Sequence, residues 1–276
     1  MPLLLSHTLV AHPEADRAAF VLHGMLGSAN NWRGFARALT AQAPRWKLIL
    51  VDLRNHGESH PAPPPHTLSA CAADLSRLAE HLGVWPEAVI GHSYGGKVAL
   101  AYAEEDARPP AQLWVLDSPP CAWPADHSDN SEVGRVIAAL RQIPLPLARR
   151  DALPPLLAAM GFSDAIGQWM TTNLRAGEGG LVWRFELDAI EPMLEDYFVR
   201  DFHPFLKNPY RETQVKLVRG ERSDRWSEAE FAWLQAHADS PGLQVYTLPQ
   251  AGHWLHTDNP AGLLAMMLEH GMGGSR

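Results

Sequence analysis

The sequence is poor in cysteine and in basic residues. Its two cysteines, Cys71 and Cys121, are too few for a disulfide framework or a cysteine-based zinc site. We therefore expect reduced thiols and a cytoplasmic protein. Lys and Arg number 23 against 31 Asp and Glu, which leaves a net charge of −8 over 276 residues. Binding to nucleic acid or to an anionic membrane needs a basic stripe, so neither partner is expected.

Long apolar runs are missing as well. No segment approaches the roughly 18 consecutive apolar residues of a membrane span. The apolar start ends at His12, after about ten residues, and no basic residue precedes it as one would in a signal peptide. No phosphate-binding loop, dinucleotide fingerprint or metal-ligand pattern occurs, so we expect no cofactor and no metal. The remaining composition, 46% hydrophobic and 20% charged, is that of a folded globular protein.

Short, continuously apolar runs alternate with helical patterns over most of the chain. Continuous apolarity is typical of strands covered on both faces. Such runs predict strands at residues 19–23, 48–52, 88–91, 113–117, 215–219 and 243–248. Helices are predicted over residues 30–42, 69–82, 94–105, 227–238 and 260–270. Together with an antiparallel edge strand within residues 3–11, this alternation predicts an α/β fold with a mostly parallel sheet and right-handed crossovers.

The alternation stops between residues 119 and 210. This stretch has clustered prolines, helix-like pieces at 132–142 and 163–174, and many Trp, Leu, Met and Phe residues. Because a linker would be less apolar, we expect a mostly helical cap inserted into the core. The predicted domains are a core of residues 1–118 and 211–276 and a cap of residues 119–210.

The strongest chemical motif is Gly91-His-Ser93-Tyr-Gly95, which follows a predicted strand and opens a predicted helix. A Gly-x-Ser-x-Gly pattern in this context is typical of a nucleophile elbow, where small residues permit a tight turn. The start of a helix also favours a developing anion. We predict that Ser93 is the nucleophile.

A second glycine turn, His23-Gly-Met25, also follows a predicted strand. Its position allows the backbone N–H of Met25 to face the elbow. Together with the N–H of Tyr94, it would form an oxyanion hole.

The general base should lie late in the chain, because the order of this kind of triad is serine, acid, histidine. His253 lies in the glycine loop directly after the last predicted strand. His256, one helical turn further on, is a rival. We predict His253 because it immediately follows the strand.

Two carboxylates compete for the position of the acid. Asp117 ends a predicted strand, and at that edge of an open α/β sheet side chains point into the crevice where ligands bind. Asp224 lies close to the usual place for the acid, after the strand at 215–219, but in a run of charged residues that favours a surface position. The residues alone leave both open. We interpret the glycine- and charge-rich loop of residues 52–59 as structural and expect Asp52 to pair with Arg54.

The chain resembles the α/β-hydrolase-fold serine hydrolases over essentially its whole length. More narrowly, it resembles the small bacterial acyl esterases and thioesterases and their mitochondrial relatives. The motifs that carry this resemblance are Asp52-Leu-Arg-Asn-His-Gly-Glu-Ser59, Gly91-His-Ser-Tyr-Gly-Gly-Lys97, Trp183-Arg-Phe-Glu-Leu187 and Gly252-His-Trp254.

The resemblance implies an eight-stranded sheet with the acid after the sixth strand. A serine then stands where other members place the acid after the seventh strand, and Asp117 and Ser223 match this arrangement. It further implies that Trp183 and Phe185 line the acyl pocket from the cap, and we expect Trp123 to join them.

The favoured function is hydrolysis of an ester or thioester of a small acyl substrate through a covalent acyl-enzyme. Carbon–carbon bond hydrolysis and perhydrolysis use the same triad and stay open. So does a different class, a ligand receptor that keeps the triad and works by movement of the cap.

Overall fold

A computed structural model describes residues 3–59, 61–124, 127, 131–208, 212–237 and 240–273. In this part of the chain, seven strands form one sheet in the order β1-β3-β2-β4-β5-β8-β9. β1 is antiparallel to β3, and the other neighbouring pairs are parallel. The strands are β1 (His7–Ala11), β2 (Arg17–Leu22), β3 (Trp46–Val51), β4 (Ala88–His92), β5 (Gln112–Leu116), β8 (Gln214–Gly220) and β9 (Leu243–Leu248).

The predicted α/β fold is confirmed, with a difference in strand count. The expected sheet has eight strands, whereas the described residues place seven in it. The described residues before β1, 3–6, do not form a further strand. Leu5 is buried there, and the Ser6 carbonyl accepts a hydrogen bond from the Asp52 amide at 2.9 Å. Residues 3–6 are therefore bonded to the loop after β3 instead of extending the sheet.

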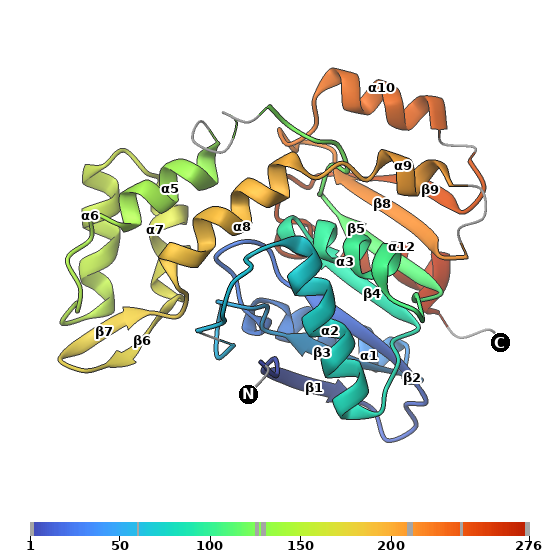
Figure 1. Cartoon of the computed structure of the whole chain (residues 1–276), viewed down its shortest axis with the longest axis horizontal. Coiled ribbons are helices and arrows are strands. Elements are labelled where there is room, and N and C mark those ends of the chain that lie inside the picture. Colours follow the sequence, from blue (N-terminus) through green and yellow to red (C-terminus); the bar gives the residue numbers. More distant parts are fainter. Residues whose placement is uncertain are drawn as a thin grey trace.

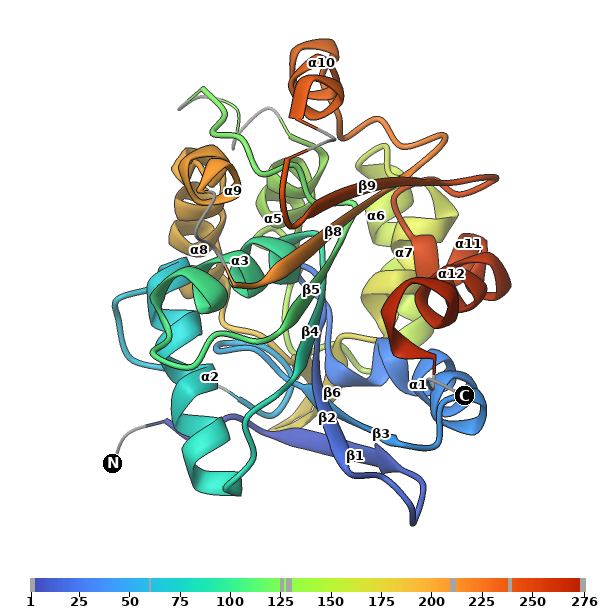
Figure 2. The ribbon, with the colours of Figure 1, turned by 90° about the vertical axis from the view of Figure 1, so that its right-hand side faces the viewer.

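Helices cover both faces of the sheet (Figure 2). One face carries α2 (Leu68–Leu82) and α3 (Tyr94–Glu105), and the other carries α1 (Arg33–Gln42), α11 (Leu255–Asp258) and α12 (Pro260–Met267). Because side chains alternate along a strand, Phe20 and Leu22 of β2 join the core under α2 and α3. Val21 joins the core under α1 and α12. Helix α10 (Glu228–His237) follows β8.

Polar residues define several helix ends. The Thr67 side chain accepts a hydrogen bond from the Ala70 amide at the start of α2. That helix ends at Gly83, whose φ of 62° is the left-handed conformation that glycine adopts without strain. The predicted helices of the core all form, which agrees with these start and stop signals.

We call the chain between β5 and β8 the insertion; its elements from α5 to β7 lie at one end of the molecule, and α9 lies beside β8 and β9 (Figure 1). Its α5 and α7 correspond to the two predicted helical pieces, and a small two-stranded sheet follows them. Helix α8 runs from this sheet back towards the core (Figure 1). The predicted boundary at residues 210 and 211 lies outside the described residues. The elements are α5 (Glu132–Leu140), α6 (Leu153–Ala159), α7 (Asp164–Thr171), β6 (Leu174–Gly177), β7 (Gly180–Trp183), α8 (Leu187–Val199) and α9 (His203–Lys207).

Candidate active site

Ser93 lies in the turn between β4 and α3, as its motif predicts. Its φ of 52° and ψ of −119° are values that a non-glycine residue rarely adopts. The turn is closely packed on both sides. A Cβ on Gly91 would overlap the Gly95 carbonyl, and a Cβ on Gly95 would lie 2.6 Å from the His23 carbonyl oxygen. These two glycines therefore permit the turn that places the serine at the start of α3.

Asp117 and His253 are brought together from two different strands. Asp117 directly follows β5, is fully buried and has a positive φ of 46°. His253 follows β9, and its Nδ1 lies 2.8 Å from Asp117 Oδ2, the length of a hydrogen bond from an imidazole N–H to a carboxylate. His253 and Ser93 line the same cavity. The geometry thus joins the predicted base to one of the two candidate acids.

The rival residues have other surroundings. The Asp224 side chain is 83% exposed and pairs with Arg225 at 3.2 Å. His256 stacks on the Trp32 ring, with centroids 4.1 Å apart. Burial lowers the pKa of His256 to about 4, which keeps this ring neutral. The structure therefore joins Asp117 to the His253 ring and pairs the exposed Asp224 with Arg225.

Four donors hold the Asp117 carboxylate in one orientation. Besides His253, Oδ2 accepts a hydrogen bond from the Ser223 hydroxyl at 2.5 Å. Oδ1 accepts from the Gly220 amide at 3.0 Å and from the Trp226 indole N–H at 2.8 Å. Ser223 lies where a residue that supports the acid would lie. Sequence reasoning missed Trp226, because a tryptophan in a loop belongs to no motif and no periodic pattern.

His92 is a further residue that the sequence analysis missed. It is buried, and its Nε2–H donates to the His253 carbonyl oxygen at 2.8 Å. Burial, with His253 and His256 nearby, lowers the pKa of His92 well below its usual value, so its ring is neutral. Position 92 is a variable position of the Gly-x-Ser-x-Gly pattern, which gives no sign that its ring holds the loop that carries the base.

Met25 and Tyr94, the predicted oxyanion donors, both line the cavity beside Ser93. Tyr94 is the first residue of α3, where a backbone N–H has no partner within the helix. Met25 lies in the loop that follows β2. Met25 and Tyr94 are thus brought to the cavity of Ser93 from a loop and from the start of a helix.

Two buried histidines, His23 and His56, hold the loop of Met25. His56 Nε2 accepts a hydrogen bond from the Leu26 amide at 3.1 Å, and His23 Nε2 accepts from the Leu53 amide at 3.0 Å. A ring nitrogen that accepts carries no proton, so each neutral ring donates from Nδ1 to a backbone carbonyl oxygen. Burial lowers the pKa of His23 from 6.5 to about 4, which preserves this neutral form.

The loop of residues 52–59 supports the same region, but the expected pair of Asp52 and Arg54 is wrong. Arg54 Nε donates to the buried carboxylate of Asp74 in α2 at 2.7 Å. Asp52 instead accepts a hydrogen bond from the Ala29 amide at 2.7 Å, beyond the loop of Met25. Backbone amides satisfy the aspartate, and a neighbouring helix supplies the counter-charge for the arginine.

A cavity of about 540 Å³ lies over Ser93. Glu132, Arg135, Asp224 and Arg225 are its charged lining residues, and Arg225 pairs with Glu132 at 2.6 Å. An apolar wall with a few convergent polar groups suits a small, partly apolar ligand. Trp123 belongs to this wall, as expected. The large apolar residues of the wall that come from the insertion are Trp123, Val133, Val136, Ile166, Trp169, Leu194, Tyr197 and Phe198.

Trp183 and Phe185 are not among the described residues that line this cavity, contrary to expectation. Both are buried, and their rings stack with centroids 5.5 Å apart. Phe185 also forms a backbone bridge with His56. The two residues precede α8, whereas the cavity is lined near the end of that helix, from Leu194 onwards. They therefore pack the junction between the insertion and the loop of residues 52–59.

The described residues give little support to a cysteine nucleophile, a metal site or a membrane-spanning helix. Burial raises the pKa of Cys71 and of Cys121 to about 12, so neither thiol is a nucleophile at neutral pH. No group of three or more described His, Cys, Asp or Glu side chains could hold a metal ion. None of the helices in the described ranges is long and apolar enough to cross a membrane.

Comparisons with known proteins agree with this geometry. Residues 20–137 match the alpha/beta hydrolase fold family. The chain is 31% identical to sn-1-specific diacylglycerol lipase ABHD11 of Mus musculus, over 94% of this chain and 82% of the lipase. It is 26% identical to Esterase YbfF of Escherichia coli (strain K12), over 88% of this chain and 89% of the esterase. A solved marine microorganism esterase is 25% identical with a TM-score of 0.82, covering 97% of this chain and 99% of that chain. The chain therefore belongs to the α/β hydrolase family.

Proposed function

We propose that this α/β hydrolase cleaves carboxylic esters of small acyl substrates through a covalent acyl-enzyme on Ser93. The observation that carries the proposal is the hydrogen bond of 2.8 Å between Asp117 and His253, whose ring lines the same cavity as Ser93. A histidine that is oriented by a carboxylate activates a serine hydroxyl as a nucleophile. The relatives named as a lipase and as esterases support an ester bond as the target.

In the first half of the reaction, Ser93 Oγ attacks the acyl carbon while His253 Nε2 takes the hydroxyl proton. The imidazolium keeps its Nδ1–H on Asp117, which stabilises the positive charge. The N–H groups of Met25 and Tyr94 donate to the oxyanion that forms on the acyl oxygen. When the intermediate collapses, His253 gives the proton to the leaving oxygen or sulfur, and the acyl group stays on Ser93.

In the second half, water replaces the leaving group. His253 takes one proton from the water while the water oxygen attacks the acyl carbon. Collapse of the second intermediate returns that proton to Ser93 Oγ and releases the carboxylic acid. One ester bond and one water molecule are consumed, and the enzyme returns to its starting state.

We assign residues 119–210 the role of a cap that closes the site, with residues 1–118 and 211–276 as the catalytic core. The insertion supplies most of the apolar wall of the cavity, while Ser93 and His253 come from the core. An acyl chain lying against this wall would exclude water from the oxyanion. Exclusion of water strengthens the hydrogen bonds that stabilise developing charge.

A fluorophosphonate probe tests the nucleophile directly. The probe should label the wild-type protein at one residue, and Ser93→Ala should abolish the labelling. Ser163→Ala is the matched control, because Ser163 lines the same cavity outside the elbow. This control should be labelled like the wild type. Labelling that persists in Ser93→Ala would overturn the proposal.

A panel of acyl esters and coenzyme A thioesters of increasing chain length tests the substrate class. Multiple turnover of esters supports the proposal, and preference for thioesters would change the leaving group but not the mechanism. Preferred cleavage of a carbon–carbon bond, or peracid formation, would replace ester hydrolysis as the function. A single slow turnover with a ligand-dependent movement of the insertion would indicate a receptor.

A further inference from the structure

Lys97 is a buried lysine that takes no part in the proposed reaction. It lies in the first turn of α3, shortly after Ser93, and is 0% exposed. Its Nζ donates hydrogen bonds to the backbone carbonyls of Cys121, Tyr197 and Arg200, each at 2.7 Å. Three acceptors match the three N–H donors of an ammonium group. The contacts are therefore complete for a charged lysine.

Two features of this position oppose a positive charge. Burial lowers the pKa of Lys97 to about 8, and the first turn of a helix disfavours a cation. The end of α8 offsets these effects, because its last carbonyls carry partial negative charge and lack partners within the helix. An apolar side chain of similar size would fill the space without either cost. Packing alone therefore does not explain a lysine here.

The three carbonyls belong to the two connections between the insertion and the core. Cys121 lies in the outgoing connection after β5. Tyr197 lies in the last turn of α8, and Arg200 ends that helix where the chain returns to the core. Lys97 thus reaches both connections from the helix that carries the nucleophile at its start.

These connections carry part of the apolar wall of the cavity. Trp123 follows the outgoing connection, Tyr197 and Phe198 lie at the end of α8, and all three line the cavity. The Trp123 amide donates to the Phe198 carbonyl at 2.7 Å, which fixes the two wall segments to each other. A shift of α8 along α3 would therefore move the wall relative to Ser93.

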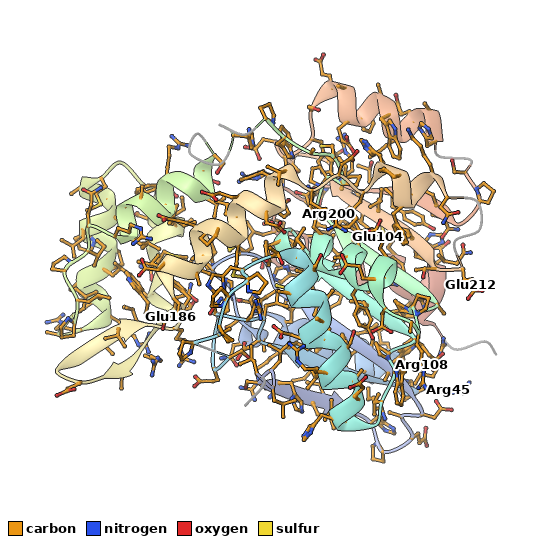
Figure 3. The ribbon with its side chains drawn as sticks, in the orientation of Figure 1. Arg45, Glu104, Arg108, Glu186, Arg200 and Glu212 are labelled. Atoms are coloured by element: carbon orange, nitrogen blue, oxygen red, sulfur yellow. The ribbon has the colours of Figure 1, made fainter. Side chains whose placement is uncertain are left out.

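A second link between the same segments lies on the surface. Figure 3 shows Arg200 beside Glu104, near the far end of α3. The Arg200 guanidinium lies 2.6 Å from Glu104 and 3.0 Å from Glu105. Partly exposed ion pairs of this kind contribute little to stability. The buried contacts of Lys97 are therefore the stronger of the two links.

We propose that Lys97 is a positioning residue that sets the apolar wall against the nucleophile elbow and so determines which acyl chains Ser93 accepts. The proposal rests on the proposed function, because it concerns the acyl group transferred to Ser93. Long acyl chains contact the wall along their length and should depend on Lys97. An acetyl group is too short to contact the wall in this way, so kcat/KM for acetyl esters should change little when Lys97 is replaced.

Lys97→Met tests this, since methionine is also unbranched but has no N–H donor. The matched control is Lys216→Met, which removes another buried lysine. Burial also lowers the pKa of Lys216, whose Nζ bonds Gln112 of β5 at 3.3 Å. In Lys97→Met, kcat/KM for p-nitrophenyl decanoate should fall about 10- to 100-fold relative to the acetate, because a misplacement of about 1 Å can cost a hundredfold. In Lys216→Met this ratio should stay at the wild-type value.

Hydrogen exchange of the full-length chain gives a readout that needs no activity. The Trp123 amide, and the Phe202 amide that donates to the Pro120 carbonyl at 2.9 Å, should exchange faster in Lys97→Met. They should be unchanged in Lys216→Met. If the wild-type protein hydrolyses no ester, the proposed function fails, and unchanged exchange would show separately that Lys97 does not hold the connections.

The conservative variant Lys97→Gln keeps two N–H donors on a shorter side chain. It should shift the decanoate-to-acetate ratio in the same direction as Lys97→Met but less. This variant carries the test if Lys97→Met does not fold. A wild-type ratio in an active, folded variant, together with a lowered unfolding temperature, would show that Lys97 is only structural and would overturn the proposal.

Discussion

Replacing Asp117 by asparagine should stop turnover while the protein stays folded. The carboxylate accepts four hydrogen bonds, from His253 and Ser223 on Oδ2 and from Gly220 and Trp226 on Oδ1. Asparagine has the same shape, but one of its two terminal atoms is an NH₂ donor. The outcome depends on which pair of partners the NH₂ group faces.

The partners on the Oδ1 side cannot adapt. The Gly220 amide and the Trp226 indole carry fixed N–H groups, and leaving either unsatisfied costs about 1–3 kcal/mol. On the Oδ2 side, the Ser223 hydroxyl can rotate to accept, and the His253 ring can move its proton from Nδ1 to Nε2. We therefore expect the NH₂ group to face Ser223 and His253.

That orientation disables the base. With its proton on Nε2, His253 cannot take the proton of Ser93. The loss of the correct tautomer costs on the order of 10⁴ in kcat. A factor of 10⁴ corresponds to about 5 kcal/mol in the barrier. The free energy of unfolding should fall by only about 1 kcal/mol, because neutral hydrogen bonds replace charge-assisted ones and no buried donor is left without an acceptor.

The assay compares kcat for p-nitrophenyl butyrate with the midpoint of urea unfolding. Asp224→Asn is the control, and it should keep nearly all activity because its side chain is exposed and paired with Arg225. Ser223→Ala should give a smaller loss than Asp117→Asn. An active Asp117→Asn with an inactive Asp224→Asn would refute the assignment of the acid and with it the reasoning about the tautomer.

Three further predictions concern the oxyanion loop, acid stability and the junction with the insertion. His56→Leu removes the acceptor of the Leu26 amide. It should lower kcat by about a hundredfold with little change in KM, as the loss of an oxyanion donor does. His56→Gln keeps an acceptor, so equal kcat values in the two variants would contradict this prediction. Burial lowers the pKa of His23 from 6.5 to about 4, so over this range the unfolded chain binds a proton that the folded chain does not. The contribution of His23 to the free energy of unfolding should therefore fall by about 3 kcal/mol from pH 6.5 to pH 4, and the neutral rings of His92 and His256 add to this fall. Urea titrations would measure it, and a flat profile would be inconsistent with neutral rings. Trp183→Ala should lower the free energy of unfolding by about 3–5 kcal/mol and leave the preference for acyl length unchanged. Altered selectivity would show that Trp183 lines the acyl pocket.

The sequence predicts the order of strands and helices well because both signals are local. Residues 48–51, for example, are apolar throughout and lie within β3, and the predicted strand of residues 243–248 coincides with β9. The elbow is equally local, since glycines around Ser93 between a strand and a helix leave the backbone few alternatives. The same holds for His253, whose glycine loop directly follows β9.

Contacts between distant segments could not be predicted in this way. Asp52 and Arg54 are close in the sequence and opposite in charge, yet the arginine pairs with Asp74, twenty residues away in α2. Trp226 and Lys97 lie in no pattern that indicates their partners. Such contacts depend on which elements the fold brings together, and a single sequence carries no record of that.

Strand register explains why the residues of the site meet at all. His92 is paired with Leu116 across β4 and β5, and Leu116 with Val218 across β5 and β8. The Ser93 amide continues the first ladder to the Leu116 carbonyl at 2.9 Å, and the Asp117 amide continues the second to Val218 at 2.7 Å.

Both turns therefore begin directly beyond the last ladder bond. The positive φ values of Ser93 and Asp117 are held by hydrogen bonds on the side of the neighbouring strand. A slip of one residue between β4 and β5 would turn every side chain of one strand to the opposite face of the sheet. The Asp117 carboxylate would then leave His253 and face the other core. The buried faces of the two strands, which exclude such a slip, thus position the nucleophile relative to the acid as much as any contact within the site.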